Sequence, residues 1–417
     1  MKINKEIRNI ILKRFLVTLG VLLFIRVGTF LPVPGINHSD LAFYLQSHSV
    51  TRNLVSTFSG DNTFVIGLFT LNIFPYINAS ILVQLILGLS PQLSKLQKGG
   101  DLEGRRTINR LTRFITLIWA IIQSGGLAFY LKQVLFNWNY GLAFEIIVWL
   151  TTGAMIVLWL SELITDYGLG NGASLLIYTN IISSLPNLSK RVILENSDIT
   201  LFSGIGVLLL IFASLYGIVF LQEGVRIIQL ISSKQLNQVS LQDSVTSNNY
   251  IPLRFNQAGV MPIILTTAIL VVPNYISQLG LFPKIDLPIN FEAFGFVYWI
   301  SYFVLILIFS SFYSTIVLNP KDISDQLQKM AVTIPGIRPG IQTTFYLKQV
   351  MKRITLVGAT MLATLATIPN LIESTLSITS LNGLSTTSLL ILAGVVLDLV
   401  REVKNIYYSN VYSNMYQ

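Results

Sequence analysis

The sequence has no cysteine, two histidines and few charged residues. The lack of cysteine excludes disulfide bonds, thiolate metal sites and a cysteine nucleophile. His38 and His48 are too few for a histidine-based metal cluster. Charged residues make up 11% of the 417 positions and hydrophobic residues 52%, whereas soluble domains carry about 25% charged residues. This composition predicts a polytopic membrane protein.

Ten apolar stretches are suited to crossing a bilayer. The first is preceded by five basic residues, but it is too long for a signal peptide, and the Leu-Pro-Val-Pro sequence at 31–34 is a poor cleavage site. It is therefore expected to be a retained span. The ten predicted spans are 11–31, 67–89, 114–131, 142–161, 172–186, 201–222, 257–278, 294–318, 354–372 and 384–400.

Lysine and arginine are distributed unequally between the loops on the two sides of these spans. Of 28 such residues, 22 fall on the side that holds both termini, five fall on the opposite side, and Arg26 lies within the first span. The positive-inside rule therefore predicts that both termini face the compartment of synthesis. The net charge of +9 is then explained mainly by the basic loops on one side of the membrane. The only contact with nucleic acid that we still consider is contact with a ribosome.

Several spans are interrupted or short, and they occupy matching positions in two halves of the chain. The second span contains Asn72, Pro75 and Asn78, and the seventh contains Pro262. The fifth and tenth are short and share the tetrapeptide Ser-Leu-Leu-Ile, at 174–177 and 388–391. Matched breaks of this kind indicate an inverted repeat with a pathway between its halves. Ordinary proline kinks in a packed bundle are the alternative.

The four interrupted or short spans carry isoleucines that can face one another. Ile73 and Ile77 are four residues apart and share a helical face, and Ile177, Ile264 and Ile391 can meet them from the other three spans. Isoleucine offers no hydrogen bond or charge to a substrate, but a narrow apolar neck excludes water and ions. The pattern favours a seal, with a simple apolar core as the alternative.

Polar groups needed by other functions are missing from the predicted spans. No Asp, Glu or Lys lies in the middle of a span, whereas ion-coupled carriers usually require one. This counts against a secondary solute transporter, which remains the alternative function. An intramembrane serine protease would need a histidine within a span. The Gly-Gly-Asp-Leu-Glu-Gly-Arg-Arg sequence at 99–106 lacks Walker spacing, so we expect no enzyme activity, metal or cofactor.

Two long loops on the basic side are suited to binding a partner. They cover residues 222–255 and 319–353, and loops of this length are unusual unless they are functional. The Ile-Pro-Gly-Ile-Arg-Pro-Gly turn at 334–340 is expected to hold Arg338 outward. Solvated positive-inside loops are the alternative.

From about Phe24 to Val403 the sequence resembles the SecY family, the channel subunits of the general protein translocase. The resemblance rests on motifs that occur in the family's order. They are Arg-Val-Gly at 26–28, Pro-Val-Pro-Gly at 32–35, Pro-Tyr-Ile-Asn-Ala-Ser at 75–80, Gly-Arg-Arg at 104–106, Gly-Leu-Gly-Asn-Gly at 168–172, Pro-Leu-Arg-Phe-Asn-Gln-Ala-Gly at 252–259, Asn-Pro at 319–320 and Pro-Gly-Ile-Arg-Pro-Gly at 335–340.

The resemblance implies an all-α fold of ten transmembrane helices in two inverted halves, residues 1–186 and 187–417. Spans two and three would face spans seven and eight across a lateral gate. A plug helix would fall near 52–62, including Thr57, Phe58, Ser59 and Gly60. The implied pore ring is Ile73, Ile77, Ala173, Ile177, Ile264 and Ile391, where Ala173 departs from the bulky residue usual in the family.

The resemblance also implies partners and a membrane. Arg338, Lys348 and Arg226 lie in the loops with which the family engages a SecA-type motor ATPase or the ribosome, although Ile227 stands where a second basic residue is common. Further implied partners are SecE-type and SecG-type small subunits, the signal recognition particle pathway, the translocating polypeptide and lipid. The segment 319–330 looks similar to plastid and cyanobacterial versions. We expect a plastid thylakoid membrane with stromal termini; a bacterial plasma membrane is the alternative.

Overall fold

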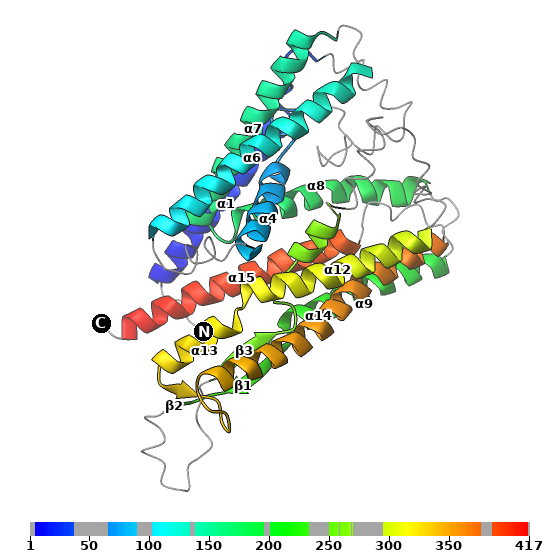
Figure 1. Cartoon of the computed structure of the whole chain (residues 1–417). Coiled ribbons are helices and arrows are strands. Elements are labelled where there is room, and N and C mark those ends of the chain that lie inside the picture. Colours follow the sequence, from blue (N-terminus) through cyan, green and yellow to red (C-terminus); the bar gives the residue numbers. More distant parts are fainter. Residues whose placement is uncertain are drawn as a thin grey trace. The chain divides into compact units, whose positions relative to one another are not determined.

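A computed structural model describes most of the chain, in which two compact units are distinguished (Figure 1). One unit comprises residues 1–197 and 395–417, and the other comprises residues 198–394. The described residues are 5–36, 66–89, 102–133, 138–195, 201–232, 250–257, 259–267, 269, 295–376 and 386–415.

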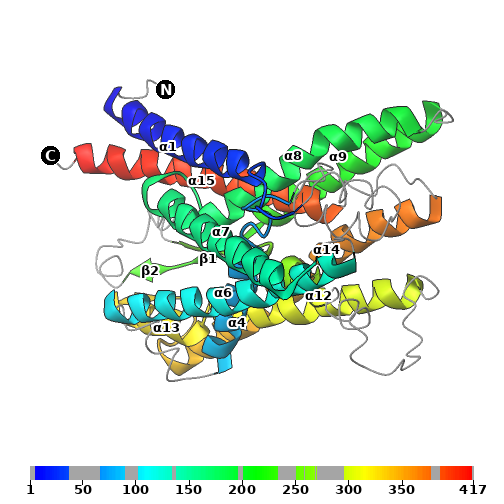
Figure 2. The ribbon, with the colours of Figure 1, turned by 90° about the horizontal axis from the view of Figure 1, so that it is seen from above.

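Helices form the described part of the first unit. In α7 the buried Ile146, Leu150, Ala154 and Val157 recur every three or four residues, so one face of the helix is apolar and packs inward. The helix α6 contacts both α7 and α4 (Figure 2). The elements are α1 (Lys5–Thr29), α4 (Phe74–Leu89), α6 (Leu102–Tyr130), the 3₁₀ turn η1 (Leu131–Gln133), α7 (Tyr140–Tyr167), α8 (Gly172–Glu195) and the part of α15 (Thr386–Met415) that follows Gly394.

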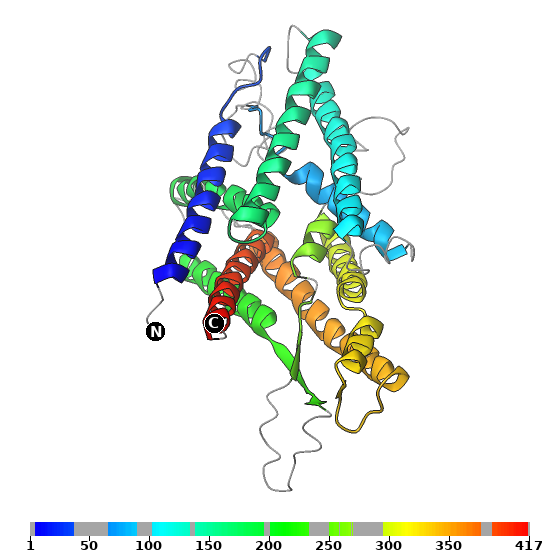
Figure 3. The ribbon, with the colours of Figure 1, turned by 90° about the vertical axis from the view of Figure 1, so that its left-hand side faces the viewer.

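The second unit combines long helices with short strands. Its helical core includes Ile218, Ile263, Tyr302, Ile306 and Leu362, and α12 packs against α14 (Figure 3). The elements are α9 (Leu201–Glu223), β1 (Val225–Gln229), β2 (Ile231–Ser232), β3 (Tyr250–Arg254), α12 (Gly295–Val317), α13 (Pro320–Lys329), β4 (Val332–Thr333), α14 (Ile341–Leu376) and the first turns of α15.

Each of the ten predicted spans has a helical counterpart among the described residues. Four helical stretches in that part of the chain are long and apolar enough to cross a membrane, namely 106–129, 140–167, 299–329 and 341–368. The chain is therefore an all-α, multi-pass membrane protein. Some helices begin well before the predicted spans, such as α6 at Leu102 and α14 at Ile341. Hydropathy detects only the apolar part of a helix that continues beyond lipid.

The second predicted span is helical in only part of its length. Residues 68–73 form turns, and α4 begins at Phe74. The break lies at Asn72, whose φ of +48° is left-handed. Pro75 follows as the second helical residue, where its missing N–H costs no intrahelical hydrogen bond. We call residues 66–77 the first break.

The seventh predicted span begins in a comparable way. Gly259 has a φ of +63°, and the helical residues start at Met261 and are described to Thr267. Pro262 is again the second helical residue. We call residues 255–267, without residue 258, the second break.

The four strands were missed by the sequence prediction. The strands β1 and β3 pair antiparallel, and β2 pairs with β4, so that Ile231 lies opposite Thr333. These short pairings occur in the two long loops and leave the all-α class unchanged. Because β2 and β4 are about 100 residues apart in the sequence, no local periodicity indicates their pairing.

Candidate functional site

Two isoleucines of the predicted ring lie on successive turns at the start of α4. The Ile77 N–H donates to the Ile73 carbonyl oxygen at 3.1 Å, which is the helical i to i−4 bond that places both residues on one face. Ile73 is 1% exposed and Ile77 4% exposed. Both side chains are thus buried within the chain itself.

A polar bridge fixes the backbone next to Ile73. Asn72 is buried, and its Oδ1 accepts the Ile73 N–H at 2.8 Å. Its Nδ2 donates to Asn180 Oδ1 on α8, also at 2.8 Å. The start of α4 is therefore hydrogen-bonded to the helix that carries Ile177.

The start of α8 is positioned by hydroxyl and amide side chains. Thr165 Oγ1 accepts the Gly172 N–H at 3.0 Å, and Asn171 Oδ1 accepts the Ala173 N–H at 3.0 Å. Thr18 Oγ1 on α1 accepts the Leu169 N–H at 2.9 Å. These bonds satisfy N–H groups that have no partner within a helix. Ala173 and Ile177 are half-buried on the helix so placed.

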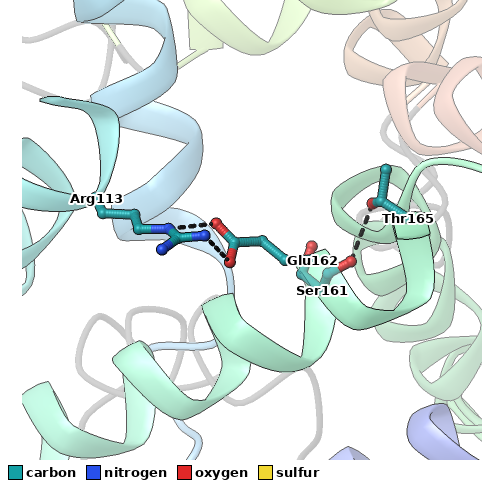
Figure 4. Close-up of polar contacts among 4 residues, drawn as sticks. All are labelled: Arg113, Ser161, Glu162 and Thr165. Atoms are coloured by element: carbon teal, nitrogen blue, oxygen red, sulfur yellow. Dashed lines mark hydrogen bonds and ion pairs between the residues drawn. The ribbon is translucent and has the colours of Figure 1, made fainter. Parts of the chain in front are cut away.

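An ion pair joins α6 to α7 in the same unit (Figure 4). Arg113 Nε and Nη2 each donate to one carboxylate oxygen of Glu162 at 2.8 Å. One turn further along α7, the Thr165 hydroxyl donates to the Ser161 carbonyl oxygen at 3.0 Å. The bidentate geometry is specific, but Arg113 is 54% exposed, so solvent screens most of its energy.

In the second unit, Ile264 follows a turn held by local polar contacts. Asn256 Nδ2 donates to the Gly259 carbonyl oxygen at 3.0 Å. Ser314 Oγ donates to Gln257 Oε1 at 2.9 Å and lies 2.6 Å from Thr355 Oγ1. This network joins the second break to α12 and α14, which carry Ser314 and Thr355 respectively.

Ile264 and Ile391 flank residues of one core in the second unit. Their chain neighbours Ile263 and Leu390 are both buried in the helical core cluster, whereas Ile264 and Ile391 themselves are half-buried. Within each unit, then, ring candidates lie beside a shared contact: the Asn72–Asn180 bond in the first and this core in the second.

The basic residues predicted to bind partners lie on one folded platform. We define the loop platform as β1 to β4, α13 and the first turns of α14. Its core is formed by residues of both long loops, including Ile228, Leu253 and Leu347. Figure 3 shows β1, β3, α13 and the start of α14 together. The three predicted residues are all exposed: Arg226 on β1, Arg338 in the 334–340 turn, and Lys348 on α14.

The 334–340 turn has the backbone geometry that its sequence predicts. Gly336 and Gly340 have φ values of +77° and +101°, and the Ile337 N–H donates to the Ile334 carbonyl oxygen at 3.1 Å. The Ser324 hydroxyl on α13 donates to the Gly340 carbonyl oxygen at 3.0 Å. The predicted plug residues Thr57, Phe58, Ser59 and Gly60, and the whole segment 52–62, lie outside the described residues.

Sequence reasoning missed Asn180 and Thr18. Both are uncharged polar residues within predicted spans, and neither stands next to a proline or another break in its apolar run. A polar side chain inside an apolar span needs a hydrogen-bond partner, and this requirement is the signal that would have found them.

Comparison with known proteins decides the family. The model of the SecY family matches residues 67–400. The chain belongs to the SecY family. The protein translocase subunit SecY of Trieres chinensis is 64% identical over 422 residues and covers 98% of each chain. That of Porphyra purpurea is 42% identical over 419 residues and covers 100% of each chain.

A solved structure has the same fold. It is a SecY protein whose plug domain is described as stabilising the closed state of the translocation channel and maintaining a membrane seal. The TM-score is 0.67 at 17% identity, over 95% of this chain and 92% of that chain. The family and the SecY fold implied by the sequence motifs are confirmed.

Proposed function

We infer that this SecY-family chain is a protein-conducting channel that passes unfolded polypeptides across a membrane and releases membrane segments sideways into lipid. The observation that carries the inference is the family match over residues 67–400, with 64% identity to a translocase subunit over nearly the full length. Water-filled cavities on each side of a short neck would spare an extended chain the cost of crossing about 30 Å of hydrocarbon.

The neck is proposed to be the ring Ile73, Ile77, Ala173, Ile177, Ile264 and Ile391. Burial of Ile73 and Ile77 supports an apolar constriction, which excludes water and ions without a specific ligand. Isoleucine side chains can close on an extended chain of any sequence because they recognise no particular group. The segment with Thr57, Phe58, Ser59 and Gly60 is proposed as a plug that seals the empty channel.

The two halves, 1–186 and 187–417, are proposed to be an inverted repeat. Corresponding features of the two breaks support this division. A left-handed residue, Asn72 or Gly259, precedes a helix whose second residue is proline. A glycine of a long helix also abuts the backbone before each turn: Gly153 of α7 lies against Leu68, and Gly358 of α14 against Phe255.

The loop platform is proposed to bind the partner that supplies energy. Arg226, Arg338 and Lys348 are exposed on one folded body, which offers positive charge at fixed spacing to an acidic surface. A SecA-type motor ATPase and the ribosome are the proposed partners, with the signal recognition particle pathway delivering substrates. SecE-type and SecG-type subunits are proposed to complete the channel within the lipid.

The chain is proposed to lie in the plastid thylakoid membrane with both termini in the stroma. Plastid and cyanobacterial relatives support this location, and the excess of basic residues on the terminal side supports the orientation. A bacterial plasma membrane with cytoplasmic termini is the alternative. We propose that the chain has no enzyme activity and binds no cofactor.

Ion flux through reconstituted vesicles distinguishes a channel from a secondary solute transporter. Vesicles that contain the resting complex should hold an ion gradient, and flux should rise only while a secretory chain is in transit. A transporter would instead show saturable, solute-dependent flux that an arrested chain does not change. Flux that is indifferent to the secretory chain would overturn the channel assignment.

A further inference from the structure

Asn72 occupies a position that few residues can fill. Its φ of +48° is left-handed, a conformation that glycine and asparagine tolerate better than other residues. It is also 3% exposed, so both ends of its amide need hydrogen-bond partners. The side chain finds one in its own turn, the Ile73 N–H, and one on another helix, Asn180 Oδ1.

Each possible substitute lacks part of this arrangement. Glycine adopts the same backbone conformation but has no side-chain amide. Aspartate keeps the acceptor for the Ile73 N–H but, when ionised, has no donor for Asn180 Oδ1. Asparagine supplies the left-handed turn, the acceptor and the donor together.

The bridge joins the two places where ring candidates of the first unit are carried. Ile73 follows Asn72 directly, and its N–H is held by the Asn72 side chain at 2.8 Å. Ile177 precedes Asn180 by three residues on α8, so the two are neighbours on one helical face. A change in the separation of Asn72 and Asn180 therefore moves Ile73 relative to Ile177.

We propose that Asn72 and Asn180 are positioning residues that set the spacing between Ile73 and Ile177, an inference that rests on the proposed pore ring. In the resting channel the intact bridge keeps the first-unit side of the ring closed. Asn72 is 3% exposed and the bond is partly buried, so water competes for it less than at the surface.

The test uses the lack of native cysteine in the full chain. Ile73→Cys and Ile177→Cys are combined, and the rate of crosslinking by a short bismaleimide is measured in membrane vesicles that hold the resting complex. Asn72→Gly and Asn180→Ala should each slow the reaction by about fivefold to tenfold. The two together should slow it no further, because both remove the same bond.

Two further variants distinguish positioning from general stability. Asn180→Asp keeps an acceptor for Asn72 Nδ2 and should restore the rate to within about twofold of the parent. Asn78→Ala, a change of a half-buried asparagine on α4 that takes no part in the bridge, should leave the rate unchanged. The unfolding temperature of each variant is measured in parallel. If the crosslinking rate correlates with the unfolding temperature across all four variants, the bridge contributes only to stability and the positioning role is wrong.

The remaining outcomes separate this inference from the proposed ring. Single cysteines at 73 and 177 are also tested for crosslinking to a secretory chain arrested in the channel. If they contact that chain while Asn72→Gly and Asn180→Ala leave the 73–177 rate unchanged, the positioning role is wrong and the ring stands. If the 73–177 pair does not crosslink in the parent although each single cysteine contacts the arrested chain, the positioning role is likewise wrong and the ring stands. If neither single cysteine contacts an engaged chain, the ring itself fails.

Discussion

The first and second breaks solve one structural problem with different side chains. Each turns the chain within a predicted span and then starts a helix, and each uses a left-handed residue followed by proline as the second helical residue. In the first break Asn72 bonds across to α8. In the second, Asn256 bonds within its own turn, to Gly259.

The two breaks differ in which residue is hydrogen-bonded to a neighbouring helix. In the first break the left-handed residue Asn72 itself couples the start of α4 to α8. In the second break the left-handed residue is Gly259, which has no side chain; the Asn256 bond there is local, and the tertiary bond to α12 is made by Gln257. A tertiary bond controls the distance between two elements, and a local bond controls only the shape of one. We therefore expect the two breaks to respond differently to substitution, although their backbones are similar.

Each break has a backbone carbonyl packed against a glycine of a long helix, and these two glycines should be the most sensitive to substitution. A Cβ on Gly153 would overlap the Leu68 carbonyl oxygen, and a Cβ on Gly358 would overlap the Phe255 carbonyl oxygen. Gly153→Ala and Gly358→Ala should each destabilise the protein by about 3 kcal/mol, measured as unfolding in detergent. Gly125→Ala on α6 is the control, because its Cβ would lie 4.0 Å from the nearest side-chain atom. Tolerance at only one of the two glycines would break the parallel.

Polar side chains in the proposed ring should open the neck. Replacing Ile77 and Ile264 together by asparagine should raise ion leak through resting vesicles on the order of tenfold and loosen the selection of signal sequences. The corresponding change at Ile146, which is buried in the core of the first unit, should reduce folding without a specific leak. Unchanged leak and unchanged selectivity in the ring variant would exclude these isoleucines as a seal.

Replacing each left-handed residue by alanine should destabilise the protein, but by different amounts. Gly259→Ala meets no heavy atom within 4 Å, so only backbone strain of about 1 kcal/mol is expected. Asn72→Ala adds the loss of one buried and one partly buried hydrogen bond and should cost about 2 kcal/mol more. Chemical unfolding of both variants measures the difference. Equal costs would show that the Asn72–Asn180 bond contributes nothing to stability.

The smallest effects are expected where helices are joined beside each break. The exposed Arg113–Glu162 pair joins α6 to α7 and should contribute about 0.5 kcal/mol, lost at high salt. The buried Ser314–Thr355 contact joins α12 to α14, and Ser314→Ala should cost about 1 kcal/mol at any salt concentration. The two contributions are compared by measuring the free energy of unfolding of Glu162→Gln and of Ser314→Ala at low and at high salt. A salt-dependent loss for Ser314→Ala would contradict this assignment.

Hydropathy and motif spacing predicted the helices and the breaks because both leave a local signal. An apolar run of about 20 residues marks a span, and Asn72, Pro75 and Pro262 mark places where a straight helix is unfavourable. The same local signal fails at helix ends. The first turns of α6 include the basic Arg106 and Arg110, so the hydropathy of the span starts later than its helix.

Contacts between distant residues could not be predicted in this way. The β2–β4 pairing brings Ile231 opposite Thr333, and the short strands have no period long enough to detect. Asn180 lies within an apolar helix and acquires a role only because Asn72 approaches it. Gly153 resembles any other helical glycine until the Leu68 backbone is placed against it.

The central claim is that the isoleucines of the proposed ring line the path of a polypeptide, and a single crosslinking measurement tests it most directly. Single cysteines replace Ile77 or Ile264 in the cysteine-free chain, and a secretory chain with one cysteine is arrested in transit. Under oxidation both positions should form a disulfide with that chain, and only when its signal sequence and the motor are present. If the arrested complex is engaged and neither position reacts, the isoleucines belong to the core and the path lies elsewhere.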